Sequence, residues 1–219
     1  MGLPILKNYI EVGNRLRDLC SSHDWLIETA NAMAAAGAEC TDNDPSGARG
    51  WRRWQMGTRR IRELHCTMDD WCRDETDQVA SIYNERLGVR IVICNTDDGT
   101  CIEARAPKNR SKKGAATDRA VDGNQASFWD YGTLDDKVVP LRAASSIAEA
   151  MVTWHLCVYH EGDDLRAELS CAIAASGGFF EEYRERIFIF GGEADTREPL
   201  KKPKPESGSD FDIPVTRKK

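Results

Sequence analysis

The spacing of apolar residues changes at Gly88, and this change constrains the fold more than any other feature of the chain. Before Gly88 the apolar residues recur at helical intervals, and after it they alternate with polar residues as in β-strands. We therefore predict an α+β protein in which a helical N-terminal half, residues 1–87, packs on an antiparallel sheet formed by residues 88–190. A chain of 219 residues is long enough for one domain of this kind with a substantial core.

Three helical segments are predicted in the N-terminal half. The first surrounds Leu16, the second begins after Ser22 as its N-cap and ends near Gly37, and the third covers residues 51–87. Gly57 is expected to break the third helix near its start.

The antiparallel sheet is predicted to consist of two hairpins. In the first hairpin, a β-branched run over residues 89–95 is followed by a turn at Asp98 and Gly99, and residues 101–105 form the returning strand. The polar face of this hairpin contains Glu103.

The second predicted hairpin joins strands at residues 152–160 and 165–173 through a turn at residues 161–164. Each strand has one apolar face and one mostly polar face. A short helix from Phe179 leading into a last strand at residues 186–190 completes the sheet. The register of the second hairpin pairs the polar side chains as His155 with Ser170, Cys157 with Glu168, and Tyr159 with Arg166.

Two segments hold an unusual share of positive charge in a chain whose net charge is −6. Residues 49–62 contain six arginines and no acid, and residues 105–119 contain six cations and one acid. This asymmetry indicates an anionic partner, because such cations neutralise phosphates and tryptophans stack on bases. The predicted anion-binding residues are Arg52, Arg53, Arg59, Arg60, Arg105, Lys108, Arg110, Lys112 and Lys113, with Trp51 and Trp54 as stacking candidates.

These observations favour a non-enzymatic protein that binds nucleic acid or another polyanion through both basic segments. The first alternative is a small hydrolase or nuclease on the polar sheet face, with Glu103, His155 and Glu168 as candidate catalytic residues. The second alternative is an assembly subunit, such as a homo-oligomer, with the stripe from Ile61 to Tyr83 as its interface. The same residues also fit a solvated sheet face and a helix whose arginines pair with acids.

The eight cysteines are irregularly spaced and form no paired C-x-x-C sets, so we predict no metal site and no cofactor. They fit a reduced, cytoplasmic protein better than a disulfide framework. Cys157, beside His155, is the one candidate for a cysteine nucleophile. No apolar run is long enough to span a membrane, and no membrane contact is expected.

Residues 191–219 are rich in Pro, Lys, Glu, Ser and Gly, which favours a flexible tail. Within it, Ser209-Asp210-Phe211-Asp212-Ile213-Pro214-Val215 resembles the acidic tip with which bacterial single-stranded-DNA-binding proteins recruit other proteins. This resemblance implies a protein partner for residues 209–215.

Overall fold

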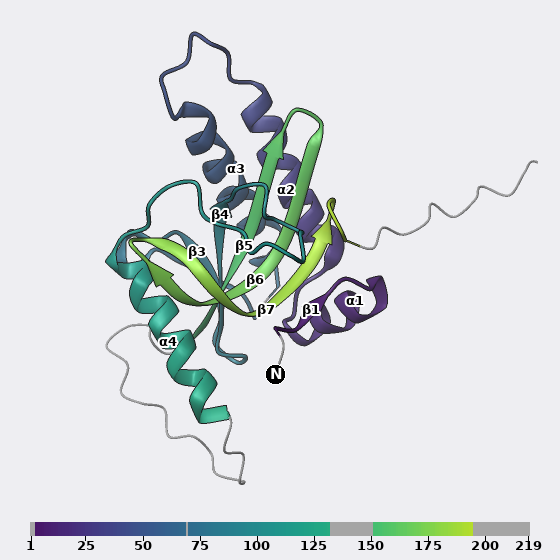
Figure 1. Cartoon of the computed structure of the whole chain (residues 1–219), viewed down its shortest axis with the longest axis vertical. Coiled ribbons are helices and arrows are strands. Elements are labelled where there is room, and N and C mark those ends of the chain that lie inside the picture. Colours follow the sequence, from purple (N-terminus) through teal and green to yellow (C-terminus); the bar gives the residue numbers. More distant parts are fainter. Residues whose placement is uncertain (1–2, 69, 132–150, 195–219) are drawn as a thin grey trace, which may run out of the picture.

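The computed structural model describes residues 3–68, 70–131 and 151–194, which form a seven-stranded mixed sheet with helices on both faces (Figure 1). The strand order is β1-β7-β6-β5-β4-β3-β2, and neighbouring strands are antiparallel except in the pairs β4–β5 and β1–β7. The elements in chain order are β1 (Ile5–Leu6), α1 (Tyr9–Asp18), α2 (His23–Ala38), α3 (Ala48–His65), β2 (Cys72–Asp74), the 3-10 helix η1 (Thr76–Gln78), β3 (Ser81–Asn84), β4 (Val89–Asn95), α4 (Ala115–Tyr131), β5 (Val152–Glu161), β6 (Asp164–Ser176) and β7 (Phe179–Phe190).

The predicted antiparallel sheet of two hairpins is wrong, because the first hairpin does not form. β4 pairs in parallel with β5 and antiparallel with β3. Residues 97–105 do not return beside β4 but form successive turns, closed by hydrogen bonds from Thr100 N to Asp97 O and from Ile102 N to Gly99 O, each 3.2 Å. The turn residues therefore shape a compact local loop rather than a hairpin.

The second hairpin has the predicted register, with Cys157 opposite Glu168 and His155 opposite Ser170. The helix predicted from Phe179 is wrong, because β7 is one continuous strand paired with β6. Several register shifts between β6 and β7 interrupt the pairing. Such irregularities break the alternation of polar and apolar residues by which a strand is recognised in a sequence.

The single long helix predicted over residues 51–87 is also wrong. α3 ends at His65, and two short strands, β2 and β3, lie between its end and Gly88. Ile61 and Ile82 both lie in one core. The apolar stripe from Ile61 to Tyr83, which predicted one helix, therefore belongs to a helix followed by strands. It is the same stripe that the assembly hypothesis used as an interface. Gly57 lies inside α3, where an added Cβ would stand 2.6 Å from Met33 Sδ, so this glycine permits close packing of α2 on α3.

Helices cover both faces of the sheet (Figure 1). The main core lies between α1–α3 and the sheet and includes Leu26, Ile93 and Leu156. A second, smaller core brings Val121 of α4 together with Phe180 and other residues of the opposite sheet face. The polar face predicted at β5 and β6 belongs to this second side, and it is buried rather than solvated.

The predicted tail tip at residues 209–215 lies outside the described residues, which end at 194. The division into a domain of residues 1–190 and a tail therefore stays a prediction. Within the described part of the chain, no helix combines the length and the apolar character needed to cross a membrane.

His65 is buried where α2 and α3 meet and keeps both ring nitrogens hydrogen-bonded. Its Nδ1 lies 3.1 Å from Ile61 O, and its Nε2 lies 2.9 Å from Ser21 Oγ. Because a carbonyl can only accept, Nδ1 donates and Nε2 accepts from the hydroxyl. Burial lowers the pKa of His65 to about 4, and burial lowers the pKa of His155 to about 3.

These two histidines predict a loss of stability in mild acid. Both have an ordinary pKa of 6.5, so the unfolded chain binds their protons before the folded protein does. Each is expected to lower the free energy of unfolding by about 1.4 kcal/mol per pH unit below that value, and the two together by about 2 to 3 kcal/mol between about pH 6 and pH 5. Urea unfolding across this range measures the slope, and an unfolding free energy that stays constant would contradict the prediction.

Candidate anion-binding surface

The first basic segment forms most of α3, and the packing of α2 positions its arginines. Gly37 of α2 faces Arg53, and an added Cβ at Gly37 would lie 2.2 Å from Arg53 Nε. The absence of a side chain at Gly37 therefore makes room for the Arg53 guanidinium between α2 and the end of β5.

Four arginines of α3 are paired with carboxylates. Arg59 Nε and Arg60 Nη1 lie 2.7 and 2.8 Å from the two oxygens of Glu63, and Arg60 also pairs with Glu28. The other two pairs are Arg62 with Glu75 at 2.9 Å and Arg52 with Glu39 at 3.5 Å. The sequence left open that these arginines pair with acids, but of the acids expected from residues 69–75 only Glu75 forms such a pair with α3 in the described structure.

Arg49 and Arg53 differ from these four, because neither has a carboxylate within 4 Å among the described residues. Arg49 Nη2 donates to Cys40 O at 3.3 Å. Arg53 Nη1 donates to His160 O and its Nη2 donates to His160 Nδ1, both at 3.1 Å. The Arg53 Nε is buried without a hydrogen-bond partner in the described structure.

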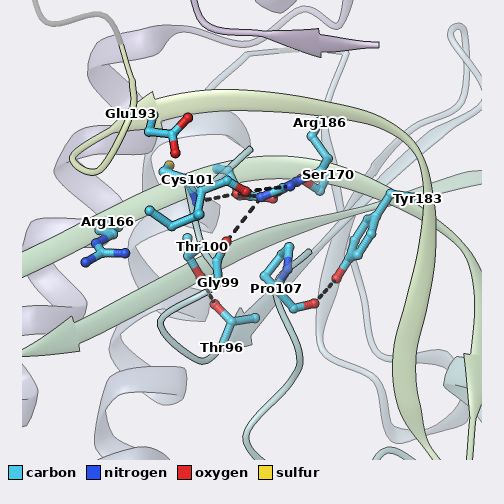
Figure 2. Close-up of polar contacts among 12 residues, drawn as sticks. Thr96, Gly99, Thr100, Cys101, Pro107, Arg166, Ser170, Tyr183, Arg186 and Glu193 are labelled. Atoms are coloured by element: carbon cyan, nitrogen blue, oxygen red, sulfur yellow. Dashed lines mark hydrogen bonds and ion pairs between the residues drawn. The ribbon is translucent and has the colours of Figure 1, made fainter. Parts of the chain in front are cut away.

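The second basic segment is anchored by hydrogen bonds of Asn109 and Tyr183. Asn109 Nδ2 donates to Gly178 O at 2.8 Å, and Asn109 Oδ1 accepts from Phe180 N at 2.9 Å. Tyr183 donates to Pro107 O at 2.6 Å, as Figure 2 shows. These bonds hold the segment across the turn between β6 and β7.

The two basic segments are linked through Asn95 of β4, next to Arg110. The backbone N of Arg110 donates to Asn95 O at 3.0 Å, and the side chain of Asn95 donates to Gly50 O in the first turn of α3 at 2.8 Å. Burial, followed by the charges of Arg110 and Arg49, lowers the pKa of Arg53. We call Arg49, Arg53 and Arg110 the three-arginine cluster.

Arg110 itself has polar and aromatic contacts at the edge of this cluster. Its Nε donates to Thr96 O at 3.1 Å, and its guanidinium lies 5.5 Å from the centroid of the Tyr159 ring. Its nearest carboxylate is that of Glu161, at 3.4 Å, and both side chains are largely exposed. An exposed pair of this kind exchanges readily with solvent or with a ligand.

The remaining predicted anion-binding residues lie elsewhere. Arg105 pairs with Asp98, while the side chains of Lys108 and Lys112 are exposed and form no ion pair in the described structure. Lys113 is half-buried and lies beside Cys94.

The two tryptophans have different settings. Trp54 packs against the main core, whereas Trp51 is 57% exposed. Two residues along a helix correspond to a rotation of about 200°, so Trp51 faces a different side of α3 from Arg49 and Arg53. Trp51 therefore does not provide a stacking surface for a base bound at the three-arginine cluster.

The candidate catalytic residues are not brought together. Glu103 is exposed and pairs with Lys7 at 2.6 Å, whereas His155 is 2% and Glu168 0% exposed. The Glu168 carboxylate accepts hydrogen bonds from Arg186, Ser170 Oγ and Cys101 N, and Figure 2 shows these three residues converging from β7, β6 and the loop after β4. Because four hydrogen bonds occupy this fully buried carboxylate, including two from the Arg186 guanidinium, Glu168 has a structural role.

The hypothesis of a cysteine nucleophile gains no support from the geometry. Burial raises the pKa of the Cys157 thiol well above its ordinary value, which keeps it protonated and poorly nucleophilic. Within residues 3–68, 70–131 and 151–194, no three His, Cys, Asp or Glu side chains are grouped to hold a metal ion.

Compared with known proteins, the chain matches no family model, no curated protein and no solved structure.

His160 and Arg49 were missed among the predicted site residues. Arg49 lies in the first basic segment and was detectable by its charge. Nothing local marks His160, because its contact with Arg53 joins residues 107 positions apart.

Proposed function

We propose that the protein binds nucleic acid or another polyanion, without catalysis, through the three-arginine cluster. The observation that carries the proposal is the link between the two basic segments, because Asn95 bonds both to Arg110 N and to Gly50 O of α3, the helix that holds Arg49 and Arg53. Like charges held together in this way are stabilised by an anion between them. Binding is expected to be modest and steeply dependent on salt, because the rest of the chain is acidic.

The start of α3 adds to this surface. Its N-cap is Gly47, which supplies no side chain to accept from the first amide groups of the helix. The N-terminal end of a helix carries a partial positive charge that favours anions. The N-terminal end of α3 and the arginines therefore both favour binding of an anion.

The double substitution Arg49→Ala with Arg110→Ala tests the proposal. Fluorescence anisotropy with labelled single-stranded DNA, duplex DNA and RNA is expected to show roughly tenfold weaker binding at low salt. The dependence of log K on log salt for duplex DNA is expected to become shallower by about 2, one unit for each lost phosphate contact.

Arg59→Ala is the matched control, because Arg59 belongs to the same helix but is exposed and paired with Glu63. We expect Arg59→Ala to bind almost as the wild type does. The proposal is overturned if the wild type shows no saturable binding at low salt, or if the double variant binds as tightly as Arg59→Ala.

A further inference from the structure

His160 lies beside the three-arginine cluster, near the end of β5. It faces Arg53 and Arg49 from α3, and Asp163 and the backbone of Gly162 from the turn between β5 and β6. The other three histidines lie elsewhere, since His65 and His155 are buried and His23 bonds to Ile189 O. His160 is therefore the histidine positioned to respond to a ligand at the cluster.

The hydrogen bond between Arg53 and His160 requires a neutral imidazole. Arg53 Nη2 lies 3.1 Å from His160 Nδ1, and a guanidinium can only donate. Nδ1 must therefore accept through its lone pair, which a protonated ring does not have. Burial, then the charge of Arg53, lowers the pKa of His160, while the Gly162 backbone and Asp163 oppose this effect and Arg49 adds to it.

The carboxylates near His160 do not offset the effects that lower its pKa. Asp163 contributes the smallest of these effects on His160. Glu161 is next to it in sequence but accepts from Arg110 at 3.4 Å and from the Tyr159 hydroxyl at 3.2 Å. A proton on His160 would therefore add a fourth positive charge to the three-arginine cluster.

Building on the proposed function, we propose that His160 takes up one proton from solvent when a phosphate group binds at the three-arginine cluster. The proton goes to Nδ1, which changes from acceptor to donor. Arg53 Nη2 then loses its bond to the ring and donates to a phosphate oxygen, as does the new Nδ1–H. The phosphate charge offsets the repulsion among the four cations, and linkage requires that protonation in turn strengthens phosphate binding.

The proposal predicts a direction and a window for the effect of pH. Affinity is constant well above the His160 pKa of the complex. It rises by up to about tenfold per pH unit as the pH falls from that value to the lower pKa of the free protein, and it is constant again below. Over the same range, the salt dependence for single-stranded DNA steepens by about 0.7, as one further cation contacts phosphate.

The experiment measures binding of a fluorescein-labelled oligothymidylate by anisotropy from about pH 8 to pH 5. His160→Gln can still accept a hydrogen bond from Arg53 but cannot take up a proton, so the histidine-dependent rise in affinity is expected to disappear. His23→Gln is the matched control and is expected to keep it. A pH dependence that is the same in the wild type and in His160→Gln overturns the linkage but leaves the proposed function intact.

A second measurement uses the wild type and so does not depend on how the variants fold. NMR titration of the His160 ring with and without saturating oligothymidylate is expected to show a higher pKa in the complex. An unchanged His160 pKa in a formed complex contradicts the linkage. Absence of binding at every pH contradicts the proposed function itself.

Discussion

Replacing Glu168 with alanine is expected to lower the free energy of unfolding by about 3 to 5 kcal/mol. Glu168 accepts from Arg186 Nε and Nη2 at 2.9 and 2.7 Å, and both side chains are 0–1% exposed. The substitution leaves the Arg186 guanidinium buried without its counter-charge. Urea unfolding followed by circular dichroism measures the loss.

Two further variants make this result interpretable. Glu103→Ala removes the exposed pair with Lys7 and is expected to change stability very little. Glu168→Gln keeps the shape and one acceptor oxygen but removes the charge, so an intermediate loss is expected. Equal stability of Glu168→Ala and Glu103→Ala would show that the buried pair does not support the fold.

The same substitution is expected to release the loop after β4. Arg186 donates to Ile102 O at 2.9 Å and to Gly99 O at 3.2 Å, and Glu168 accepts from Cys101 N at 2.5 Å (Figure 2). Faster amide hydrogen exchange at Cys101 in Glu168→Ala than in Glu103→Ala would report this release.

Local patterns predicted the elements that local interactions form. Ser22 accepts from Trp25 N as the N-cap of α2, and the hairpin of β5 and β6 has the register set by its turn. The parallel pairing of β4 with β5 was not predictable in this way. Its partners Val89 and Val152 are joined by a long connection that includes α4, and no turn residue specifies such a pairing.

The buried polar face shows why burial is harder to predict than register. The alternation that placed Glu168 and His155 on one face of a sheet was right, but a polar face next to solvent and one covered by a helix have the same pattern. The cover comes from α4 and from residues 97–113, whose backbone groups Gly99 O, Ile102 O and Cys101 N bond to side chains of β6 and β7. Backbone groups are common to all sequences and so leave no compositional trace.

The candidate surface was predictable in its charge but not in its geometry. Composition marked Arg53 and Arg110 as anion-binding residues. It did not separate them from Arg59, whose charge is compensated by a carboxylate four residues away. It also could not show that the segments are linked, because the contact from Asn95 to Gly50 spans 45 residues.

Replacing Asn124 with alanine is expected to destabilise the protein by about 3 kcal/mol or more, because three buried backbone groups lose their partner. The described pairing of β5 with β6 begins at His155 and Ser170. Just beyond this pair, at Thr153 of β5 and Ala172 of β6, Asn124 of α4 bridges the two strands. Its Nδ2 donates to Thr153 O at 2.8 Å and to Ala172 O at 2.7 Å, and its Oδ1 accepts from Thr153 N at 2.7 Å. Asn124 thus replaces the missing ladder bonds and fixes α4 to the sheet.

Gln125→Ala is the matched control for this prediction, since Gln125 is the next residue of α4 and is exposed. Its stability is expected to stay within about 0.5 kcal/mol of the wild type in urea unfolding. Asn124→Asp separates the two halves of the amide, because it keeps an acceptor for Thr153 N but loses both donors and places a carboxylate against two carbonyl oxygens. We expect Asn124→Asp to be at least as unstable as Asn124→Ala. Wild-type stability in Asn124→Asp would mean that the amide does not donate to Thr153 O and Ala172 O.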